Sequence, residues 1–216
     1  MMDEAGARNT GRLALAIGAV AAGSAVCLGT YFAAGGPFGT INDIGNAATG
    51  LLSGLLAWRL RRQIPERAGD VAVGGALFGG AITVVGSTLV VSGTTGFLFA
   101  GLVSGVGFAG IGAWLVILNR TAGEVGLWPS RLRALGVAAG ALMAVGVVLA
   151  PGIVLRLDDM ATAPTWVWIG FLGWLGTYVA YPAWAIWMGN GQRRSFDARV
   201  TASTQTERDV PSWTGG

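Results

Sequence analysis

The sequence predicts an all-α, polytopic membrane protein, a bundle of six transmembrane helices in three antiparallel hairpins. Three observations predict this fold: a low content of charged residues, six long apolar runs, and arginines confined to alternate connections between the runs. Charged residues make up 12% of the 216 residues, against about 25% in soluble globular domains. So few charges cannot cover a water-facing surface, and lipid is therefore the expected solvent for much of the chain.

The six apolar runs are each close to the ~20 residues that cross about 30 Å of hydrocarbon. No charged side chain falls well inside a run, but the second run is the least apolar because its first turns carry Asn42, Asp43 and Asn46. The runs are Leu13 to Gly35, Thr40 to Leu60, Val71 to Val91, Phe97 to Leu118, Leu135 to Leu155 and Trp166 to Met188.

The first run is predicted to stay as a true span rather than to be a signal peptide. Its apolar stretch is longer than the 7–15 residues typical of a signal-peptide core. Short turns at Gly36–Gly39 and Ser92–Gly96 make consecutive helices antiparallel neighbours. The expected organisation is a cytoplasmic N-terminal segment (1–12), a six-helix transmembrane domain (13–189) and a disordered cytoplasmic tail (190–216) rich in Ser, Thr, Arg and Asp.

The arginines predict which way the bundle sits in the membrane. Short arginine-rich loops stay on the cytoplasmic side. With six spans, every arginine except Arg156 falls on one side, together with both termini, and removing one span would scatter the charges over both faces. We therefore expect cytoplasmic N- and C-termini and a multi-pass protein of a bacterial inner (plasma) membrane; the bacterial source is inferred from the use of arginine without lysine and the abundance of Ala, Gly and Val.

Tryptophans are expected to form aromatic belts at the two membrane boundaries. Those at the predicted cytoplasmic ends of the runs are Trp58, Trp114, Trp184 and Trp187, and those at the opposite boundary are Trp166 and Trp168.

Small residues recur at helical spacing and predict tight helix packing. In lipid, helices associate through close contacts of small residues and through a few hydrogen bonds. Four runs carry such faces, which we expect to form seams within one chain: Gly75, Gly79, Thr83 and Ser87; Gly101, Gly105, Ala109 and Ala113; Gly136, Gly140 and Ala144; Gly170, Gly173 and Gly176.

Two prolines, Pro151 and Pro182, fall inside the fifth and sixth runs. Each removes a backbone hydrogen bond and is predicted to kink its helix, as a static bend or as a hinge of the kind that transporters use.

The candidate functional site is the polar cluster Asn42, Asp43 and Asn46 at the outer end of the second run. Asn42 and Asn46 lie one helical turn apart, and the same four-residue step leads to Gly50, Gly54 and Trp58, so the amides are expected to face a neighbouring helix. In one interpretation the cluster is structural, with Asp43 capping the helix or lying in its first turn. In the other, it lines an outward-facing pocket for a polar ligand or cation.

Tyr178 and Tyr181 form a second polar group, for which the sequence suggests no partner; structural hydrogen bonding or anchoring at the membrane interface is the expected role.

Several chemistries are excluded by composition. Without histidine or lysine there is no imidazole base, His-ligated metal or haem, and no Schiff base for retinal or pyridoxal phosphate. Cys27 alone forms no disulfide or thiolate cluster. No carboxylate is expected at membrane depth for proton-coupled pumping. We therefore expect no enzyme activity, no cofactor, no metal and no nucleic-acid partner.

Two blocks of the chain, Gly36–Asp43 and Tyr181–Gly189, resemble segments of uncharacterised six-span bacterial membrane proteins. The resemblance implies a compact helical bundle and supplies no activity, ligand or catalytic residue.

The function expected from these observations is that of a non-enzymatic integral membrane protein with a structural, regulatory or partner-binding role. Its partners would be membrane lipids, another membrane subunit or further copies of the chain. The alternative is a small permease or channel-like protein for a neutral or weakly polar solute, with its site at Asn42, Asp43 and Asn46.

Overall fold

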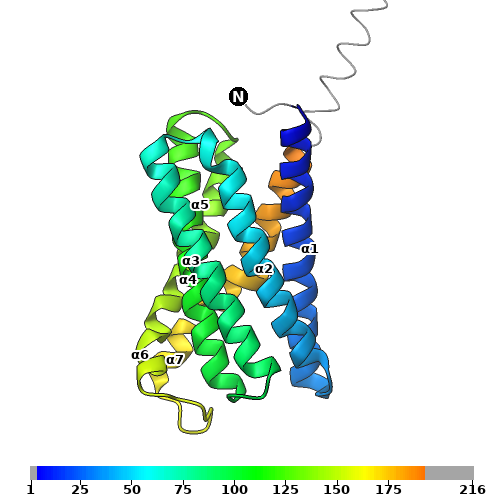
Figure 1. Ribbon diagram of the computed structural model, residues 1–216, viewed down its shortest axis with the longest axis vertical. Coiled ribbons are helices and arrows are strands. Elements are labelled where there is room, and N and C mark those ends of the chain that lie inside the picture. Colours follow the sequence, from blue (N-terminus) through cyan, green and yellow to red (C-terminus); the bar gives the residue numbers. More distant parts are fainter. Residues whose placement is uncertain (1–3, 193–216) are drawn as a thin grey trace, which may run out of the picture.

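The computed structural model describes residues 4–192, which are helical along almost their whole length and include no β-strand. Four long helices come first, and a series of shorter helical pieces follows (Figure 1). The long helices are α1 (Glu4–Ala34), α2 (Phe38–Leu60), α3 (Glu66–Val91) and α4 (Phe97–Glu124), with a short 3₁₀ turn, Arg61–Gln63, after α2. The shorter pieces are α5 (Ser130–Ala144), a 3₁₀ segment (Val145–Leu149), α6 (Ala150–Val154), α7 (Thr165–Gly170), α8 (Gly173–Leu175), a π-helical turn (Gly176–Ala180) and a final helix, residues 181–192.

Four stretches of the described chain are long and apolar enough to cross a membrane. They are Ala5–Ala34, Glu66–Val91, Phe97–Glu124 and Ser130–Val154. The other two predicted runs differ in kind: α2 carries the polar cluster near its start, and the predicted sixth run is broken at Phe171 and Leu172, between α7 and α8. The predicted N-terminal segment, 1–12, belongs to α1 from Glu4 onward, whereas the predicted disordered tail lies outside the described residues from 193.

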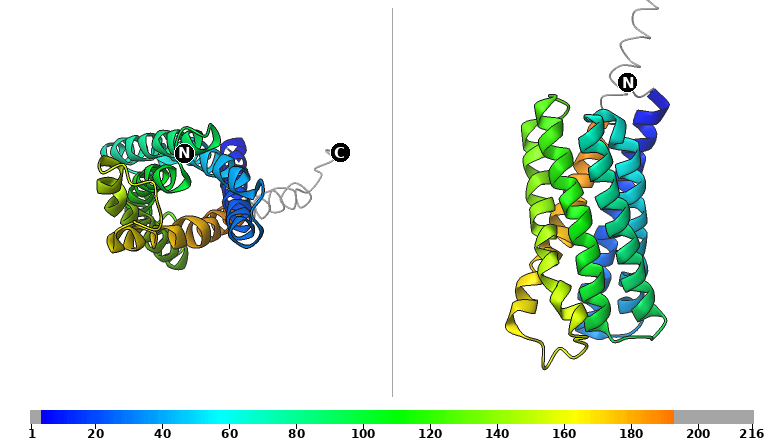
Figure 2. Two further views of the ribbon diagram at one scale, coloured as in Figure 1. Left: turned by 90° about the horizontal axis from the view of Figure 1, so that it is seen from below. Right: turned by 60° about the vertical axis from the view of Figure 1, so that its left-hand side comes forward.

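The long helices lie along one axis, and consecutive helices pack side by side from α1 to α5 (Figure 2). Helix α4 occupies the middle of the bundle and contributes more buried residues than any other helix. The pieces between α8 and residue 192, called here the C-terminal segment (173–192), pack against α1 and α5. The beginning of α1, the α2–α3 and α4–α5 connections and the end of the C-terminal segment all lie at one end of the bundle, called here the arginine end (Figure 1).

Close backbone contacts join α3 to its two neighbours, and we call this contact the glycine seam. A Cβ atom built on Gly80 would lie 2.6 Å from the carbonyl oxygen of Gly50 on α2. On another side of α3, a Cβ on Gly107 of α4 would lie 2.6 Å from the carbonyl oxygen of Gly79. Both distances are shorter than real Cβ atoms tolerate, so only glycine allows the helices to approach this closely.

The predicted small-residue faces agree in part with these seams. Thr83 and Ser87 are buried beside Gly79 on α3, and Gly140 of α5 lies so close to Gly112 of α4 that an added Cβ would be 2.5 Å from its oxygen. Two predicted members lie elsewhere: Gly101 has open space around its Cα, and Ala113 is exposed. The seam residues Gly80 and Gly112 stand outside the predicted sets.

Both predicted kink prolines come two residues after the end of a segment that departs from α-helical geometry. Pro151 comes after the 3₁₀ segment Val145–Leu149, and Pro182 comes after the π turn, in which the Tyr181 N–H bonds the Gly176 carbonyl. Since proline has no N–H to offer the preceding turn, an altered hydrogen-bond pattern before it satisfies the local backbone in another way.

The tryptophan belt prediction was wrong for Trp114 and Trp184. Their side chains are 1% and 0% exposed, and their rings pack edge to face with centroids 6.2 Å apart. They belong to the main apolar core, which fills the half of the bundle nearer the arginine end. In contrast, Trp58, Trp168 and Trp187 are exposed, as residues of a belt should be.

The loop between α6 and α7 is tied to the start of α4 by one carboxylate. Asp158 accepts hydrogen bonds from the backbone N–H groups of Gly96, at 2.7 Å, and Phe99, at 3.1 Å. These donors belong to the first turn of α4, which has no hydrogen-bonding cap of its own. Asp158 therefore caps α4 from a distant part of the chain.

Candidate functional site

The polar residues of α2 form one buried face, although not the face that the four-residue step predicts. Asn42, Asn46, Thr49 and Ser53 are all at most 6% exposed. Their spacing alternates between four and three residues, which keeps them on one side of a helix with 3.6 residues per turn. A repeated four-residue step drifts around the helix, and Trp58 at its end is indeed 56% exposed.

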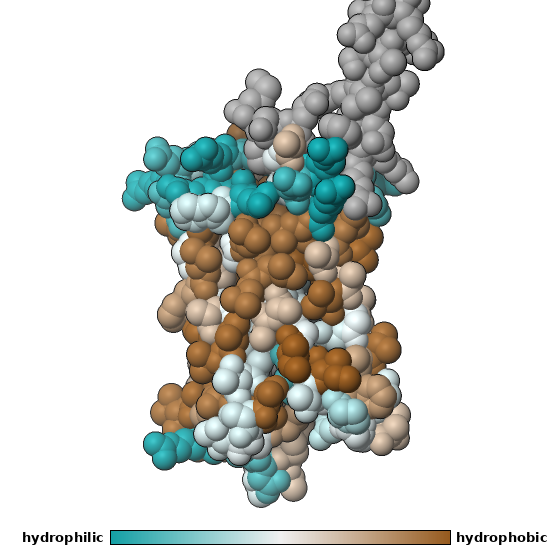
Figure 3. Space-filling view, turned by 45° about the vertical axis from the view of Figure 1, so that its right-hand side comes forward, coloured by the Kyte–Doolittle hydropathy of each residue, from teal (hydrophilic) through white to brown (hydrophobic). Residues whose placement is uncertain are grey.

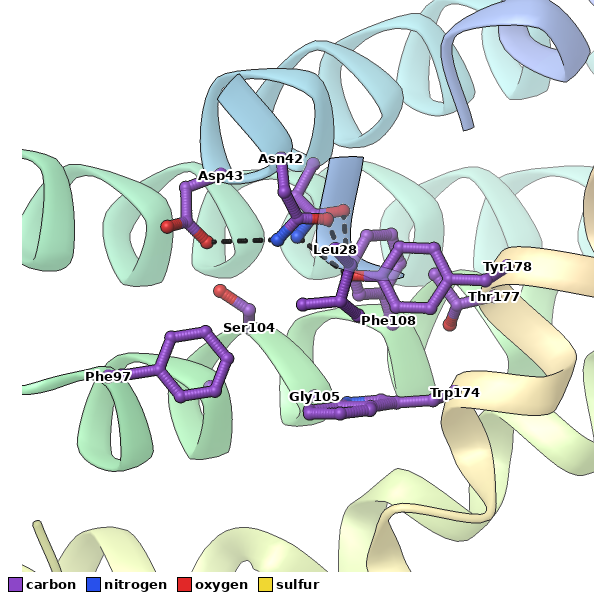
Figure 4. Close-up of a pocket in the computed structure, with 12 residues that line it drawn as sticks. Leu28, Asn42, Asp43, Phe97, Ser104, Gly105, Phe108, Trp174, Thr177 and Tyr178 are labelled. Atoms are coloured by element: carbon purple, nitrogen blue, oxygen red, sulfur yellow. Dashed lines mark hydrogen bonds between the residues drawn. The ribbon is translucent and has the colours of Figure 1, made fainter. Parts of the chain in front are cut away.

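A tyrosine of the C-terminal segment bonds both amides on this face. The Asn46 Nδ2 group donates to the Tyr178 hydroxyl at 2.9 Å. The same hydroxyl lies 3.2 Å from Asn42 Oδ1 and 3.2 Å from Asn46 Oδ1, and its single proton serves one of these acceptors at a time (Figure 4). Tyr178 thus connects two successive turns of α2 to the C-terminal segment.

Asp43 has a different environment from the one predicted. Because α2 begins at Phe38, directly after the turn formed by Gly35 and Gly36 at φ 67° and 72°, Asp43 lies in the second turn. The interpretation of Asp43 as a cap or first-turn acid was therefore wrong. Its side chain is 9% exposed, and Oδ1 accepts one long hydrogen bond, 3.4 Å, from Asn42 Nδ2.

A small cavity of about 20 Å³ lies beside the cluster. That volume is about the size that one water molecule requires. Asp43 and Ser104 face each other across it, with Phe97 and Trp174 nearby (Figure 4). The Ser104 hydroxyl, on a residue 8% exposed, has no hydrogen-bond partner within residues 4–192.

Asp43 is the only ionisable carboxylate that lines this cavity. Within the described chain, no group of three or more His, Cys, Asp or Glu side chains is placed to hold a metal ion. The arrangement can therefore accept hydrogen bonds from one small polar guest through Asp43 and exchange one with Ser104.

Two more side chains of the C-terminal segment form buried hydrogen bonds, and the sequence analysis missed their partners. The Tyr181 hydroxyl lies 2.7 Å from Ser53 Oγ. Since Ser53 donates its own proton to the Thr49 carbonyl at 2.6 Å, Tyr181 is the donor to Ser53. Tyr178 and Tyr181, with their partners Asn42, Asn46 and Ser53, are called here the hydroxyl seam.

Toward the arginine end, Trp184 continues this series with a bond to α4. Its Nε1 donates to Asn119 Oδ1 at 3.1 Å, and Asn119 Nδ2 donates to the Leu115 carbonyl at 2.8 Å. The tyrosines and the tryptophan recur every three residues; Tyr181 and Trp184 are buried, and Tyr178 is half-buried. The three-residue spacing and Asn119, the amide directly after the fourth run, were the available sequence signal for the contact between Trp184 and α4.

Comparison of the chain with protein-family models, with curated proteins and with solved structures finds no match. The resemblance of two short blocks to six-span bacterial membrane proteins therefore stays a prediction. Any functional assignment must come from the geometry of the chain itself.

Proposed function

We propose that the chain is an integral membrane protein of six spans, in three antiparallel hairpins, with both termini on the cytoplasmic side of a bacterial inner membrane. Four long apolar helices support membrane insertion. The connections that carry most arginines lie at the arginine end, whereas Arg156 lies in the loop at the opposite end. This asymmetry is the one that positively charged cytoplasmic loops produce.

The surface supports the same proposal. Hydrophilic residues gather at the arginine end, and below them a broad apolar band runs around the face shown in Figure 3. Exposed residues such as Phe78, 70% exposed, and Val26, 69% exposed, contribute apolar surface of the kind that lipid tails cover. A water-soluble bundle of this size would leave this surface unpartnered.

We further propose a non-enzymatic role, in which the bundle acts as a structural, regulatory or partner-binding membrane component. The observation that carries this proposal is that the amides of the candidate site are buried and bonded to Tyr178. Their hydrogen-bonding capacity holds two helices together, and the cavity beside them has room for little more than one water. The partners would be membrane lipids, another membrane subunit or a second copy of the chain.

Cysteine accessibility tests the topology. In a Cys27→Ser background, we expect Thr162→Cys to react with a membrane-impermeant maleimide on intact cells. Leu127→Cys, exposed in the connection at the arginine end, should react only after the membrane is permeabilised. Labelling of both sites on intact cells, or recovery of the protein in the soluble fraction, would contradict the proposed insertion.

A second candidate function is a small permease or channel-like activity for a neutral or weakly polar solute. The observation that favours it is the pair Asp43 and Ser104, which offer hydrogen-bonding capacity to the cavity that no neighbouring helix uses. Opening of the cavity would require Tyr178 to release the α2 amides. Such a motion would convert a packing contact into a gate.

Osmotic swelling of proteoliposomes tests this second function, with urea and glycerol as the neutral probes. Transport predicts swelling faster than in protein-free vesicles, and slower swelling after Asp43→Ala or Asn46→Ala in protein that remains folded. Swelling at the protein-free rate excludes transport of these solutes. Loss of folding in both variants, with no flux in the wild type, supports the structural role.

A further inference from the structure

A shallow, open groove runs between α4 and α5 at the arginine end of the bundle. Its upper part is polar and is lined by Arg120 and Glu124 from α4 and by Ser130 and Arg133 from α5. Its lower part is apolar and is lined by Val137, Ala138 and Ala141 of α5. The groove is thus amphipathic along its length.

The two arginines give the upper part an excess of positive charge over its single carboxylate, Glu124. Arg120 is exposed, whereas Arg133 is half-buried and its Nε atom has no hydrogen-bond partner among the described residues. The Arg133 guanidinium packs against the backbone at Gly123. Arg133 is therefore a half-buried cation at the wall of the groove, and its guanidinium can pair with an anion bound there.

The apolar part is long enough for the upper part of a lipid tail. Val137 and Ala141 lie four residues apart on a helical path, which corresponds to about 6 Å at ~1.5 Å per residue. One leaflet of a hydrocarbon core of about 30 Å is about 15 Å deep, so the strip covers the part of an acyl chain nearest the headgroup. Small side chains along α5 leave room for an acyl chain to lie against the helix.

We propose that this groove binds one anionic phospholipid of the cytoplasmic leaflet, with its phosphate between Arg120 and Arg133 and one acyl chain along the Val137–Ala141 strip. The inference deepens the lipid-binding role and rests on the proposed membrane insertion. An anionic lipid is favoured over a zwitterionic one because it brings no cation to repel the two arginines. The carboxylate of Glu124, at the rim of the groove, repels the phosphate of the same lipid and weakens its binding.

The test uses the full-length protein, purified in detergent and supplied with phosphatidylglycerol or with phosphatidylcholine of identical acyl chains. Native mass spectrometry counts bound lipids, and thermal unfolding measures the shift in Tm. We expect phosphatidylglycerol to bind about tenfold more tightly than phosphatidylcholine. Arg120→Gln and Arg133→Gln should each remove most of that preference.

Arg131→Gln is the matched control. Arg131 is exposed on the same helical turn as Arg133 and does not line the groove, and its substitution removes the same charge. It should keep the full preference. Glu124→Gln should strengthen phosphatidylglycerol binding, opposite in sign to the arginine variants. If Arg133→Gln fails to fold, Arg120→Gln at its exposed position and Arg133→Lys, which keeps the charge, still test the site.

Ala138→Phe tests the apolar half of the groove without any change of charge. Ala138 is exposed, so the larger ring is tolerated and fills the strip. It should weaken the binding of phosphatidylglycerol, and inorganic phosphate alone should produce no Tm shift. A free-phosphate site would show the reverse in both measurements.

Equal losses in Arg120→Gln, Arg133→Gln and Arg131→Gln would overturn the proposal, because the preference would then come from the general positive charge of this end. Equal binding of the two lipids by the wild type would overturn it as well. Failure of the membrane topology is recognised separately by maleimide labelling, so the two proposals can fail independently.

Discussion

The glycine seam and the hydroxyl seam join helices of the same bundle by opposite means. Along the glycine seam, α3 meets α2 and α4 backbone against backbone at Gly50, Gly79, Gly80 and Gly107, with only the small Thr83 side chain packed beside the contact. Along the hydroxyl seam, large side chains keep the C-terminal segment at a distance from α2 and bond its amides and Ser53. The glycine seam depends on the absence of side-chain atoms, whereas the hydroxyl seam depends on particular hydrogen-bonding atoms.

This difference indicates which substitutions should destabilise each seam. A lipid environment supplies no hydrophobic force between helices, so association relies on close packing and on hydrogen bonds. Close packing fails when any atom is added, whatever its chemistry. A hydrogen-bonded seam tolerates changes of side-chain shape better than the loss of one hydrogen-bonding group, because the group that remains is buried and cannot bond to water instead.

The largest effect is expected from one methyl group in the glycine seam. Gly80→Ala places a Cβ atom against the Gly50 carbonyl oxygen, and the helices must separate, at a cost of about 2–3 kcal/mol. Gly74→Ala on the same helix is the control, since nothing lies within 4 Å of its Cβ position. Unfolding of both variants in detergent measures the difference; equal stabilities would show that the seam adapts.

Removal of one hydroxyl should have the next largest effect. Tyr178→Phe keeps the ring but leaves the Asn46 amide and the Asn42 carbonyl without their shared partner, and we expect a loss of about 1–2 kcal/mol. Adding Asn46→Leu to this variant should recover part of the loss, because an apolar pair needs no partner. A double-mutant cycle measures the coupling, and strictly additive effects would contradict the hydroxyl seam.

Asp158 lies outside both seams and provides an intermediate reference. Asp158→Ala removes the acceptor that caps α4, with an expected loss of about 1 kcal/mol. Asp158→Asn, which keeps one carbonyl oxygen, should lose less. Equal unfolding temperatures for the alanine variant and the wild type would mean that water replaces the carboxylate fully.

The smallest effect is expected from the exposed ion pair between Arg61 and Asp70, which joins the ends of α2 and α3 at the arginine end. Asp70→Asn should cost at most about 0.5 kcal/mol, because water and salt screen such pairs. The difference should vanish at high salt, whereas the effects in both seams should persist. A salt-sensitive Tyr178→Phe effect would instead indicate that the hydroxyl seam is open to solvent.

The sequence allowed the helical class and the position of the polar residues to be predicted, because both follow from local composition. Asn42 and Asn46 are buried between helices, as their place on α2 suggests. Their partner Tyr178 could not be predicted, since it lies 132 residues from Asn46 and no periodicity relates the two. The place in an aromatic belt expected for Trp114 and Trp184 was wrong for a related reason: position along a run does not specify the side of the helix.

The sixth predicted run shows a different limit. Hydropathy describes it as one span, but Gly170, Gly173 and Gly176 sit against other helices, and the chain there divides into α7, α8 and a π turn. Glycines of this kind favour close approach at the expense of helix stability. Whether the chain breaks depends on neighbours that a single run does not reveal.

The π turn at Gly176–Ala180 also sets the direction in which side chains beyond it point along the C-terminal segment. Each residue of an α-helix advances the direction of the side chain by about 100°, so a single extra or missing residue turns everything beyond it to another side. The wide turn absorbs one residue and lets Tyr178, inside it, and Trp184, beyond it, reach different helices at the same time. A one-residue deletion here would leave a more regular helix, in which Tyr178 and Trp184 could no longer both reach their hydrogen-bonding partners.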